Sequence, residues 1–368
     1  MDKKNQRPEF HGSDLEKIAA YYHIPASEIP GIIKFGANVN PLGLSESVKN
    51  DLAGHLDIIS SYPDRNYTSL KKTIGEYCHI SPEHIVVGNG STELISLLIS
   101  QRQAKKALVV GPTYSEYERE LALTGGTITE YNLKEDLNFQ LDMQDFFASM
   151  ADDVDLLILC NPNNPTSSAI KNHDMKQILT FCKERNIFVM IDETYVEFAP
   201  DVAEITAIPL TDEFDNVMVI RGVSKFYAAP GLRFGYGITS NHDFLEALLI
   251  HQNPWSLNSV AAYAGEHMFK DHAYQQATRQ LICSERGRMY TAIQNMPAFK
   301  AYKPYANFIL VRILKEGITS FDIFEAAIKE HMMIRDCSSF KSLDGEYIRF
   351  CIMNPEDNTH LLKLLEQF

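Results

Sequence analysis

The sequence predicts an α/β fold, with a large domain built on a mostly parallel mixed sheet and a smaller α+β domain after it. Short apolar runs alternate with helix-period segments through much of the chain, and such continuous apolar strands favour a parallel sheet covered on both faces. Polar motifs recur where these runs end, at the edge where such sheets bind ligands. The length of 368 residues suffices for a large domain and a companion.

The expected strands of the large domain are apolar runs that end in turn residues. They cover residues 84–90, 107–113, 155–165, 187–194 and 216–222, with a further strand-like stretch at 232–238. Helical periodicity is typical of the connecting segments 92–100 and 175–185. This alternation of strand and helix predicts the parallel part of the sheet.

The two ends of the chain have a different pattern. Ser13 and Glu16 have capping-box spacing, which predicts a short helix starting just after His11. Beyond residue 260 we expect helices at 261–269, 272–295 and near 323–331, and strands at 308–313 and 347–352. We therefore divide the chain into an N-terminal segment, 1–32, that joins the small domain, a large domain, 33–259, and a small domain, 260–368.

Composition narrows the possible partners. The formal net charge of −14 disfavours nonspecific binding to nucleic acid or to an anionic membrane. The first residues lack the apolar core of a signal peptide, and no apolar run is long enough to span a bilayer, so we expect a cytoplasmic protein. The six cysteines include no C-x-x-C pair, so neither a disulfide framework nor a metal site is indicated.

A small-residue turn at Gly90, Ser91 and Thr92 opens an expected helix. The free N–H groups and the positive dipole at a helix start suit a phosphate, and Ser224 and Arg233 could complete the cradle. A glycine turn before a helix is also common for structural reasons alone, so GNGSTE leaves both interpretations open.

Three further polar residues follow apolar strands. Asp192 would be a costly isolated carboxylate unless it met a cation or a donor, such as a protonated ring nitrogen, a helix end or a lysine. Asn164, in NPNNPTS, is explained by turn chemistry or by an amide that donates to a phenolate oxygen. Lys225 is either a snorkelling surface lysine or an amine that forms a Schiff base with an aldehyde. With the phosphate cradle, these are the parts that bind pyridoxal 5′-phosphate.

A series of motifs carries a family resemblance over nearly the whole chain. They read FGANVNPLG, SYPDRNY, GNGSTE, NPNNPT, IDETYVEF, SKFYAAPGLRFGY, NPWSLNSVAAYAGE and IRDCSSFKSLDGEYIRF. The sequence resembles the fold-type-I pyridoxal-phosphate enzymes of the aminotransferase class. Within that class it is similar above all to the threonine-phosphate decarboxylases, which are related to the histidinol-phosphate aminotransferases. The motifs are specific for the cofactor as a set, and only a few discriminate the reaction.

The resemblance implies a role for each residue around the cofactor ring. Lys225 would carry the bond to the aldehyde, and Asp192 would pair with the pyridinium nitrogen. Asn164 and Tyr195 would contact the phenolic oxygen. Tyr114 would stack on the ring, although aromatic packing alone would explain it as a single residue.

The same resemblance implies how the cofactor phosphate is held. It would lie among Gly90, Ser91, Thr92, Ser224 and Arg233. Tyr62 would reach it from the neighbouring subunit, because this family builds its sites at the interface of a homodimer. Aromatic packing is again the alternative for Tyr62 taken singly.

Substrate contacts are implied at both ends of the chain. The position of Arg349 binds the substrate carboxylate in the resembling family, with Asn164 beside it, and Arg335 lies where the substrate phosphate is held. Each arginine could otherwise be a solvent-facing edge residue. His11, in an HGS segment that is usually HGG, would approach the substrate phosphate, or else be a surface histidine.

The expected reaction is decarboxylation of O-phospho-L-threonine to an aminopropanol phosphate of cobalamin synthesis. Trp255, in PWSLN, favours it, whereas Met353 stands where such decarboxylases have another arginine. The alternative is an aminotransferase that acts on histidinol phosphate with 2-oxoglutarate. The bond held perpendicular to the cofactor ring decides between them. A noncatalytic cofactor-binding regulator would need an appended basic helix-turn-helix, and the residues before 33 are too few for one.

Overall fold

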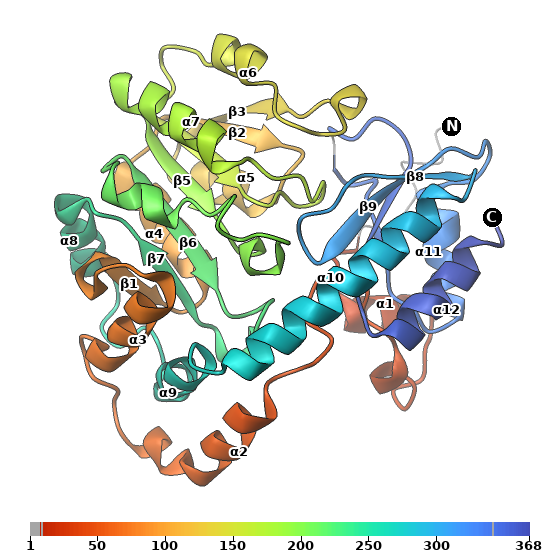
Figure 1. Cartoon of the computed structure of the whole chain (residues 1–368), viewed down its shortest axis with the longest axis horizontal. Helices are drawn as coiled ribbons and strands as arrows, with labels where there is room; N and C mark the ends of the chain where they lie inside the picture. Colours follow the sequence, from red (N-terminus) through yellow and green to blue (C-terminus); the bar gives the residue numbers. More distant parts are fainter. Residues whose placement is uncertain (1–7, 9, 341) are drawn as a thin grey trace.

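Two β-sheets organise the chain in the computed structural model, which describes residues 8, 10–340 and 342–368 (Figure 1). The larger sheet has seven strands in the order β1-β7-β6-β5-β4-β2-β3. They are β1 (Ile85–Gly88), β2 (Lys106–Gly111), β3 (Thr127–Asn132), β4 (Leu156–Cys160), β5 (Phe188–Asp192), β6 (Val217–Gly222) and β7 (Gly235–Ile238). Only β7 runs antiparallel to its neighbours, β1 and β6. The predicted α/β class and mostly parallel sheet are confirmed.

Helices cover both faces of this sheet, which explains why its strands are apolar throughout. Along β4, Leu157 and Leu159 belong to one hydrophobic core, whereas Leu156 and Ile158 belong to another. The second core is closed by α4 (Ser91–Arg102), α5 (Glu116–Leu123) and α8 (His242–His251). The first is closed on its side by α3 (Thr68–Cys78), α6 (Met143–Ser149) and α7 (Asn172–Glu184). A strand buried on both faces leaves little room for polar residues until it ends.

The smaller sheet has four antiparallel strands in the order β10-β11-β9-β8. They are β8 (Phe299–Ala301), β9 (Phe308–Ile313), β10 (Arg335–Asp336) and β11 (Tyr347–Cys351). The remaining helices are α1 (Leu15–Tyr21), α2 (Glu46–Gly54), α9 (Ser259–Met268), α10 (His272–Gln294), α11 (Ser320–Lys329) and α12 (Pro355–Leu365). The long α10 leads from the large sheet to the small one (Figure 1).

The N-terminal segment lies against the small sheet's helices. The ring of Phe10 stacks on Phe324 of α11, with centroids 5.8 Å apart, and the hydroxyl of Tyr22 donates to Glu325 Oε1 of the same helix at 3.3 Å. These contacts agree with a segment that joins the small domain, while the limits 1–32, 33–259 and 260–368 stay a prediction. The helix α9 packs against α2 and α3.

Three local predictions were wrong or incomplete. The Ser13–Glu16 capping box does not form, because α1 begins at Leu15 and its N-cap is Asp14; the Asp14 carboxylate accepts a hydrogen bond from the His11 backbone N–H at 2.8 Å. Arg233 lies in a left-handed turn, with φ 52°, before β7 rather than inside a strand that starts at 232. The strand β3 was not expected, because it is a mostly exposed edge strand of mixed polarity.

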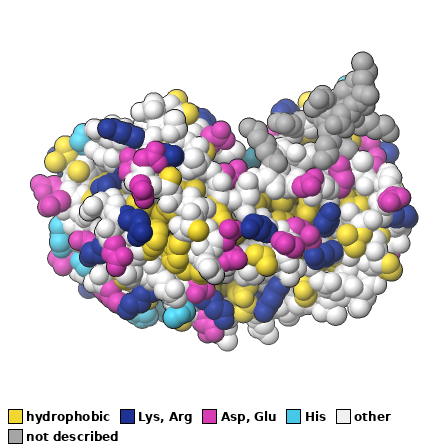
Figure 2. All heavy atoms as spheres, turned by 90° about the horizontal axis from the view of Figure 1, so that it is seen from above, with side chains coloured by type: hydrophobic (Ala, Val, Ile, Leu, Met, Phe, Trp, Pro, Cys, Tyr) yellow, Lys and Arg dark blue, Asp and Glu magenta, His cyan; other side chains and the backbone are white. Residues whose placement is uncertain are grey.

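The surface carries charges of both signs. Figure 2 shows acidic and basic side chains interspersed over one face, with hydrophobic side chains gathered toward its middle. Within the described part of the chain, no helix is both long enough and apolar enough to cross a bilayer.

Candidate active site

A cavity of about 250 Å³ lies where the loops after β4, β5 and β6 meet the start of α4. Most of the residues predicted to bind the cofactor line it. They are Ser91, Thr92, Tyr114, Asn164, Asp192, Tyr195, Ser224, Lys225 and Arg233. The structure therefore brings together residues that are spread over more than 140 positions of the sequence, as expected for the C-terminal edge of an α/β sheet.

Lys225 lies in the loop that follows β6. Its Nζ atom donates a hydrogen bond to the carbonyl oxygen of Ala37 at 2.7 Å. Burial lowers the pKa of this lysine from 10.5 to about 8, and the nearby positive charges of Arg349 and Arg233 act in the same direction. A lysine with such a pKa supplies a larger fraction of neutral, nucleophilic amine near neutral pH than an exposed one.

Asp192 is the last residue of β5, and the strand's alternation turns its side chain toward the α5 face of the sheet. Its Oδ1 atom accepts from the backbone N–H and the hydroxyl of Thr194, at 2.9 and 2.5 Å. Its Oδ2 atom accepts from the hydroxyl of Tyr117 at 2.7 Å. The sequence reasoning missed Tyr117, although its place three residues after Tyr114 at the start of a helix was a usable signal.

The start of α4 forms an open cradle. Gly90 is the N-cap of this helix and has φ +84°, which a side chain rarely adopts. A Cβ atom at Gly90 would come within 2.6 Å of Arg233 Nη2. The first N–H groups of α4 have no partner inside the helix. Among the described residues, the side chain of Arg233 makes only a long hydrogen bond, 3.4 Å, to the Pro230 carbonyl. The cradle can hold an anion the size of a phosphate.

Two amides mark the opposite side of the cavity. Asn164 accepts a hydrogen bond from Arg349 Nη1 at its Oδ1 atom, so its NH₂ group is turned toward the remaining space. The hydroxyl of Tyr195 accepts from Asn38 Nδ2 at 3.4 Å. The Oδ1 atom of Asn38 is buried and has no hydrogen-bond partner among the residues that the structure describes.

These groups fit the expected pyridoxal phosphate. The cradle suits its phosphate, the Asp192 carboxylate its ring nitrogen, and the Asn164 amide its phenolic oxygen. The amine of Lys225 suits its aldehyde. The buried, unpaired oxygen of Asn38 is the kind of atom that a bound molecule or water satisfies.

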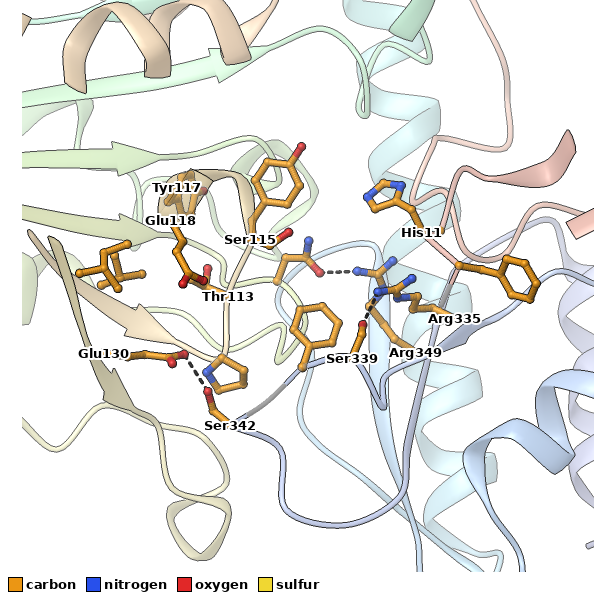
Figure 3. Close-up of a pocket in the computed structure, with 18 residues that line it drawn as sticks. His11, Thr113, Ser115, Tyr117, Glu118, Glu130, Arg335, Ser339, Ser342 and Arg349 are labelled. Atoms are coloured by element: carbon orange, nitrogen blue, oxygen red, sulfur yellow. Dashed lines mark hydrogen bonds between the residues drawn. The ribbon is translucent and has the colours of Figure 1, made fainter. Parts of the chain in front are cut away.

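A second cavity, of about 390 Å³, adjoins the first. Five residues line both cavities: His11, Tyr114, Tyr117, Asn164 and Arg349. The outer cavity adds Arg335 from β10 and Ser339 from the loop after it (Figure 3). Because β10 and β11 are antiparallel and pair Arg335 with Arg349, these two arginines lie directly opposite each other. The pairing register of β10 and β11 thus places two arginines that are 14 positions apart in the sequence next to each other.

The two guanidinium groups lack charge compensation. Arg349 is 5% exposed, donates to Asn164 Oδ1 and to the Gly36 carbonyl at 2.8 Å, and leaves its Nε buried without a partner. Arg335 donates to the Ser339 hydroxyl at 2.7 Å. Neither forms an ion pair with an acidic side chain of residues 8, 10–340 and 342–368. Like charges directly opposite each other destabilise a strand pair, so the site favours a bound anion.

His11 reaches this cavity from the N-terminal segment (Figure 3). Burial and the nearby charge of Arg335 lower its pKa from 6.5, so the ring is neutral at pH 7. Its Nδ1 atom accepts from the Ser13 backbone N–H at 3.3 Å, which places the ring proton on Nε2. A neutral imidazole of this tautomer can donate to a phosphate oxygen.

The opposite wall of the outer cavity is acidic. Glu118 and Glu130 line it, and Glu130 Oε1 accepts from the Ser342 hydroxyl at 2.7 Å. This hydrogen bond joins β3 of the large sheet to the loop between β10 and β11 of the small one (Figure 3). The sequence offered no signal for this pairing, because the two residues are 212 positions apart and Glu130, unlike Ser342, lies in no recognised motif.

Gly90 and Tyr62 are not among the residues that line either cavity, and Tyr62, unlike Gly90, forms no part of the phosphate cradle in this chain. Its ring is 81% exposed and lies 4.8 Å, between centroids, from the ring of Trp255. The guanidinium of Arg65 lies over the same indole, 5.5 Å from its centroid. The predicted role of Tyr62 requires a second subunit and stays a prediction.

Comparisons with known proteins agree with this fold. The family model described as "Aminotransferase class I and II" matches residues 30–365. The threonine-phosphate decarboxylase of Salmonella typhimurium is 34% identical over 355 residues, which cover 96% of this chain and 95% of that protein.

Solved structures were compared as well. The histidinol-phosphate aminotransferase from Clostridium acetobutylicum has a TM-score of 0.85 and 33% identity, over 90% of this chain and 98% of that one. The L-threonine-O-3-phosphate decarboxylase from Porphyromonas gingivalis has a TM-score of 0.80 at 24% identity, over 92% and 99% of the two chains, and shares the fold. Identity is alike for proteins of the two activities, so the site residues have to discriminate the reaction.

Proposed function

This chain belongs to the aminotransferase class I and II family, and from that premise we propose that it decarboxylates O-phospho-L-threonine to (R)-1-aminopropan-2-yl phosphate. It is a pyridoxal-phosphate-dependent enzyme. In the proposed reaction the bond between Cα and the carboxylate breaks, carbon dioxide leaves, and Cα gains a proton. The product is the aminopropanol phosphate used in cobalamin synthesis.

One observation carries the proposal: two uncompensated arginines lie opposite each other in a cavity that adjoins Lys225. O-Phospho-L-threonine carries two separate anionic groups, a carboxylate and a phosphate, whereas histidinol phosphate carries only the phosphate. Phosphothreonine therefore engages both Arg335 and Arg349 at once, whereas histidinol phosphate engages only one of them and leaves the pair to the two carboxylates of 2-oxoglutarate. Bidentate hydrogen bonding by guanidinium suits both anions.

Each cation has a distinct part. Arg349, fixed by the Gly36 carbonyl and by Asn164, binds the substrate carboxylate. Arg335 and the Nε2 proton of His11 bind the substrate phosphate. Holding the substrate at both anions orients it, and orientation selects which bond at Cα stands perpendicular to the cofactor ring.

The residues of the inner cavity orient the cofactor. When bound, the cofactor supplies an electron sink for the pair left by the departing carbon dioxide. Asp192 holds a proton at the ring nitrogen, Asn164 and Tyr195 bind the phenolic oxygen, and Tyr114 covers the ring face. The Nζ atom of Lys225 carries the proton that is delivered to Cα.

A second candidate function is transamination of histidinol phosphate or a related amino acid. The 33% identity to the aminotransferase from Clostridium acetobutylicum favours it. It would require the same residues to place the Cα–H bond, rather than the Cα–carboxylate bond, perpendicular to the ring, and it would consume 2-oxoglutarate.

We also propose a homodimer in the cytoplasm. The exposed Tyr62 and Trp255 rings form an aromatic surface, and a partner copy that covered it could bring its own Tyr62 to the phosphate cradle. All six cysteines are free, as is usual in a reducing compartment. Sedimentation of the wild-type protein and of Y62A, with cofactor affinity measured on the same samples, tests the dimer. A wild-type protein that sediments as a monomer and still binds the cofactor tightly would contradict it.

Product analysis tests the proposed reaction. The purified protein is incubated with O-phospho-L-threonine, O-phospho-L-serine and histidinol phosphate, each with and without 2-oxoglutarate. We expect carbon dioxide and aminopropanol phosphate from phosphothreonine without any 2-oxo acid. Absence of carbon dioxide, together with 2-oxoglutarate-dependent turnover of histidinol phosphate, would replace the proposal by the aminotransferase.

A further inference from the structure

Tyr117 is a buried polar residue for which neither the sequence nor the proposed reaction supplies a role. Its side chain is 1% exposed and packs in the core between the sheet and α4, α5 and α8. Its hydroxyl donates to Asp192 Oδ2 at 2.7 Å. Burial, followed by the charge of Asp192, raises the pKa of Tyr117 well above its usual value of 10.0, so the hydroxyl stays a neutral donor.

Within the described part of the chain, the hydrogen bonds of the Asp192 carboxylate leave one of its acceptor positions unoccupied. A carboxylate has about four acceptor positions. Thr194 occupies two of them through its N–H and hydroxyl, and Tyr117 occupies a third. Asp192 also lines the inner cavity, so the remaining acceptor position is the one available to a bound molecule there.

The two hydrogen-bond partners of Asp192 differ in how firmly they can fix the orientation of its carboxylate relative to the rest of the fold. Thr194 is two residues away, and such a local turn forms around many aspartates. Tyr117 is 75 positions away on α5, and its hydroxyl therefore ties the carboxylate to a separate element of the fold. A hydrogen bond donated to a carboxylate favours its charged form.

We propose that Tyr117 is a positioning residue, which holds the Asp192 carboxylate charged and turned toward the cavity so that a shared proton stays on the ring nitrogen of the cofactor. The inference rests on the cofactor site of the proposed function. Without the hydroxyl, the proton moves toward the carboxylate, and the ring nitrogen loses part of its positive charge.

The test compares Y117F with a matched control, Y77F. Tyr77 also donates from its hydroxyl to a carboxylate, Glu197 Oε1 at 2.6 Å, but lies outside both cavities. Each protein is loaded with pyridoxal phosphate that carries ¹⁵N in the ring, and the ¹⁵N chemical shift of that nitrogen is measured by NMR. D192N supplies the shift of a ring nitrogen that has lost its carboxylate.

We expect the ¹⁵N chemical shift of the ring nitrogen to be the same in Y77F as in the wild type. In Y117F it should change clearly toward the value measured in D192N. Loss of one hydrogen bond to a charged group should also weaken cofactor binding by Y117F about tenfold. Replacing Tyr117 by 3-fluorotyrosine, which keeps both shape and donor, should retain the wild-type shift. A Y117F protein with the shift and the affinity of Y77F would overturn the inference, and Y117L is measured in the same way should Y117F fail to fold.

The same data separate this inference from the proposed function, because they involve no substrate. If the wild-type protein binds no pyridoxal phosphate at Lys225, the proposed function fails. If the wild type binds it and Y117F behaves as Y77F does, only the role of Tyr117 fails.

Discussion

Arg349 on β11 donates a hydrogen bond from Nη1 to Oδ1 of Asn164, which lies in the loop after β4. This contact joins a strand of the small sheet to a loop of the large one, and both residues line both cavities. A second hydrogen bond, from Arg349 Nη2 to the Gly36 carbonyl at 2.8 Å, fixes the same guanidinium. Arg349, the proposed ligand of the substrate carboxylate, is thus hydrogen-bonded to Asn164, the proposed ligand of the cofactor's phenolic oxygen. A substrate that binds Arg349 therefore also affects the orientation of Asn164.

Substitution of Arg349 by alanine should abolish most of the turnover. Truncating one partner of a buried, hydrogen-bonded charge pair costs about 2–5 kcal/mol, so we expect kcat/KM for phosphothreonine to fall by about 10²-fold or more. Steady-state kinetics measure the effect. R312A is a matched control, because Arg312 pairs with Glu135 on the surface; equal losses in R349A and R312A would contradict the assignment.

Substitution of His11 by alanine should act on phosphate binding. A lost hydrogen bond to a charged group weakens binding by about 1.5–3 kcal/mol, so KM for phosphothreonine should rise at least about tenfold. The absorption spectrum of the bound cofactor should not change. H23A, in the same N-terminal segment, should behave as wild type. An H11A protein with an unaltered KM would remove His11 from the substrate site.

The lowered pKa of Lys225 predicts a pH dependence for cofactor uptake. Only the neutral amine attacks an aldehyde, and the folded protein releases this proton at a pKa of about 8 instead of 10.5. The rate of pyridoxal-phosphate uptake by the cofactor-free protein should therefore rise with pH and level off above about 8. Stopped-flow absorbance measures it. R349A removes a nearby positive charge and should shift the midpoint upward, whereas a wild-type rate that keeps rising toward pH 10.5 would exclude a perturbed lysine.

Gly90 should tolerate no side chain. Alanine there would have φ +84° and a Cβ atom 2.6 Å from Arg233 Nη2, and the strained backbone costs about 1–3 kcal/mol. We expect G90A to unfold at lower urea concentration and to bind pyridoxal phosphate at least about tenfold more weakly. The control is G231A, since a Cβ atom there meets nothing within 4 Å. Wild-type cofactor affinity in G90A would contradict the phosphate cradle.

The sequence predicted the parts of this protein that depend on continuous patterns. The strand at β5 was recognisable because it is apolar on both faces until Asp192 ends it, and the helix α4 because glycine precedes its periodic residues. The edge strand β3 escaped prediction because it is half exposed and polar, so no alternation distinguished it.

The site residues that belong to sequence motifs at strand ends could be predicted. The contacts that depend on how distant strands pair could not. Asp192 ends a strand, and Lys225 and Asn164 lie in the loops after two others, so the sheet itself brings them together. The facing of Arg335 and Arg349 depends on the register of a two-residue strand, and the Ser13–Glu16 box failed because Asp14 serves as the N-cap. Register and competing caps are decided by tertiary contacts that the local sequence does not encode.

Borohydride trapping tests the central claim most directly. The purified protein is loaded with pyridoxal phosphate, reduced with sodium borohydride, digested and analysed by peptide mass spectrometry. A phosphopyridoxyl group on Lys225, absent from K225A, is the predicted result. Labelling of another lysine in the wild-type protein, with Lys225 unmodified, would contradict the account.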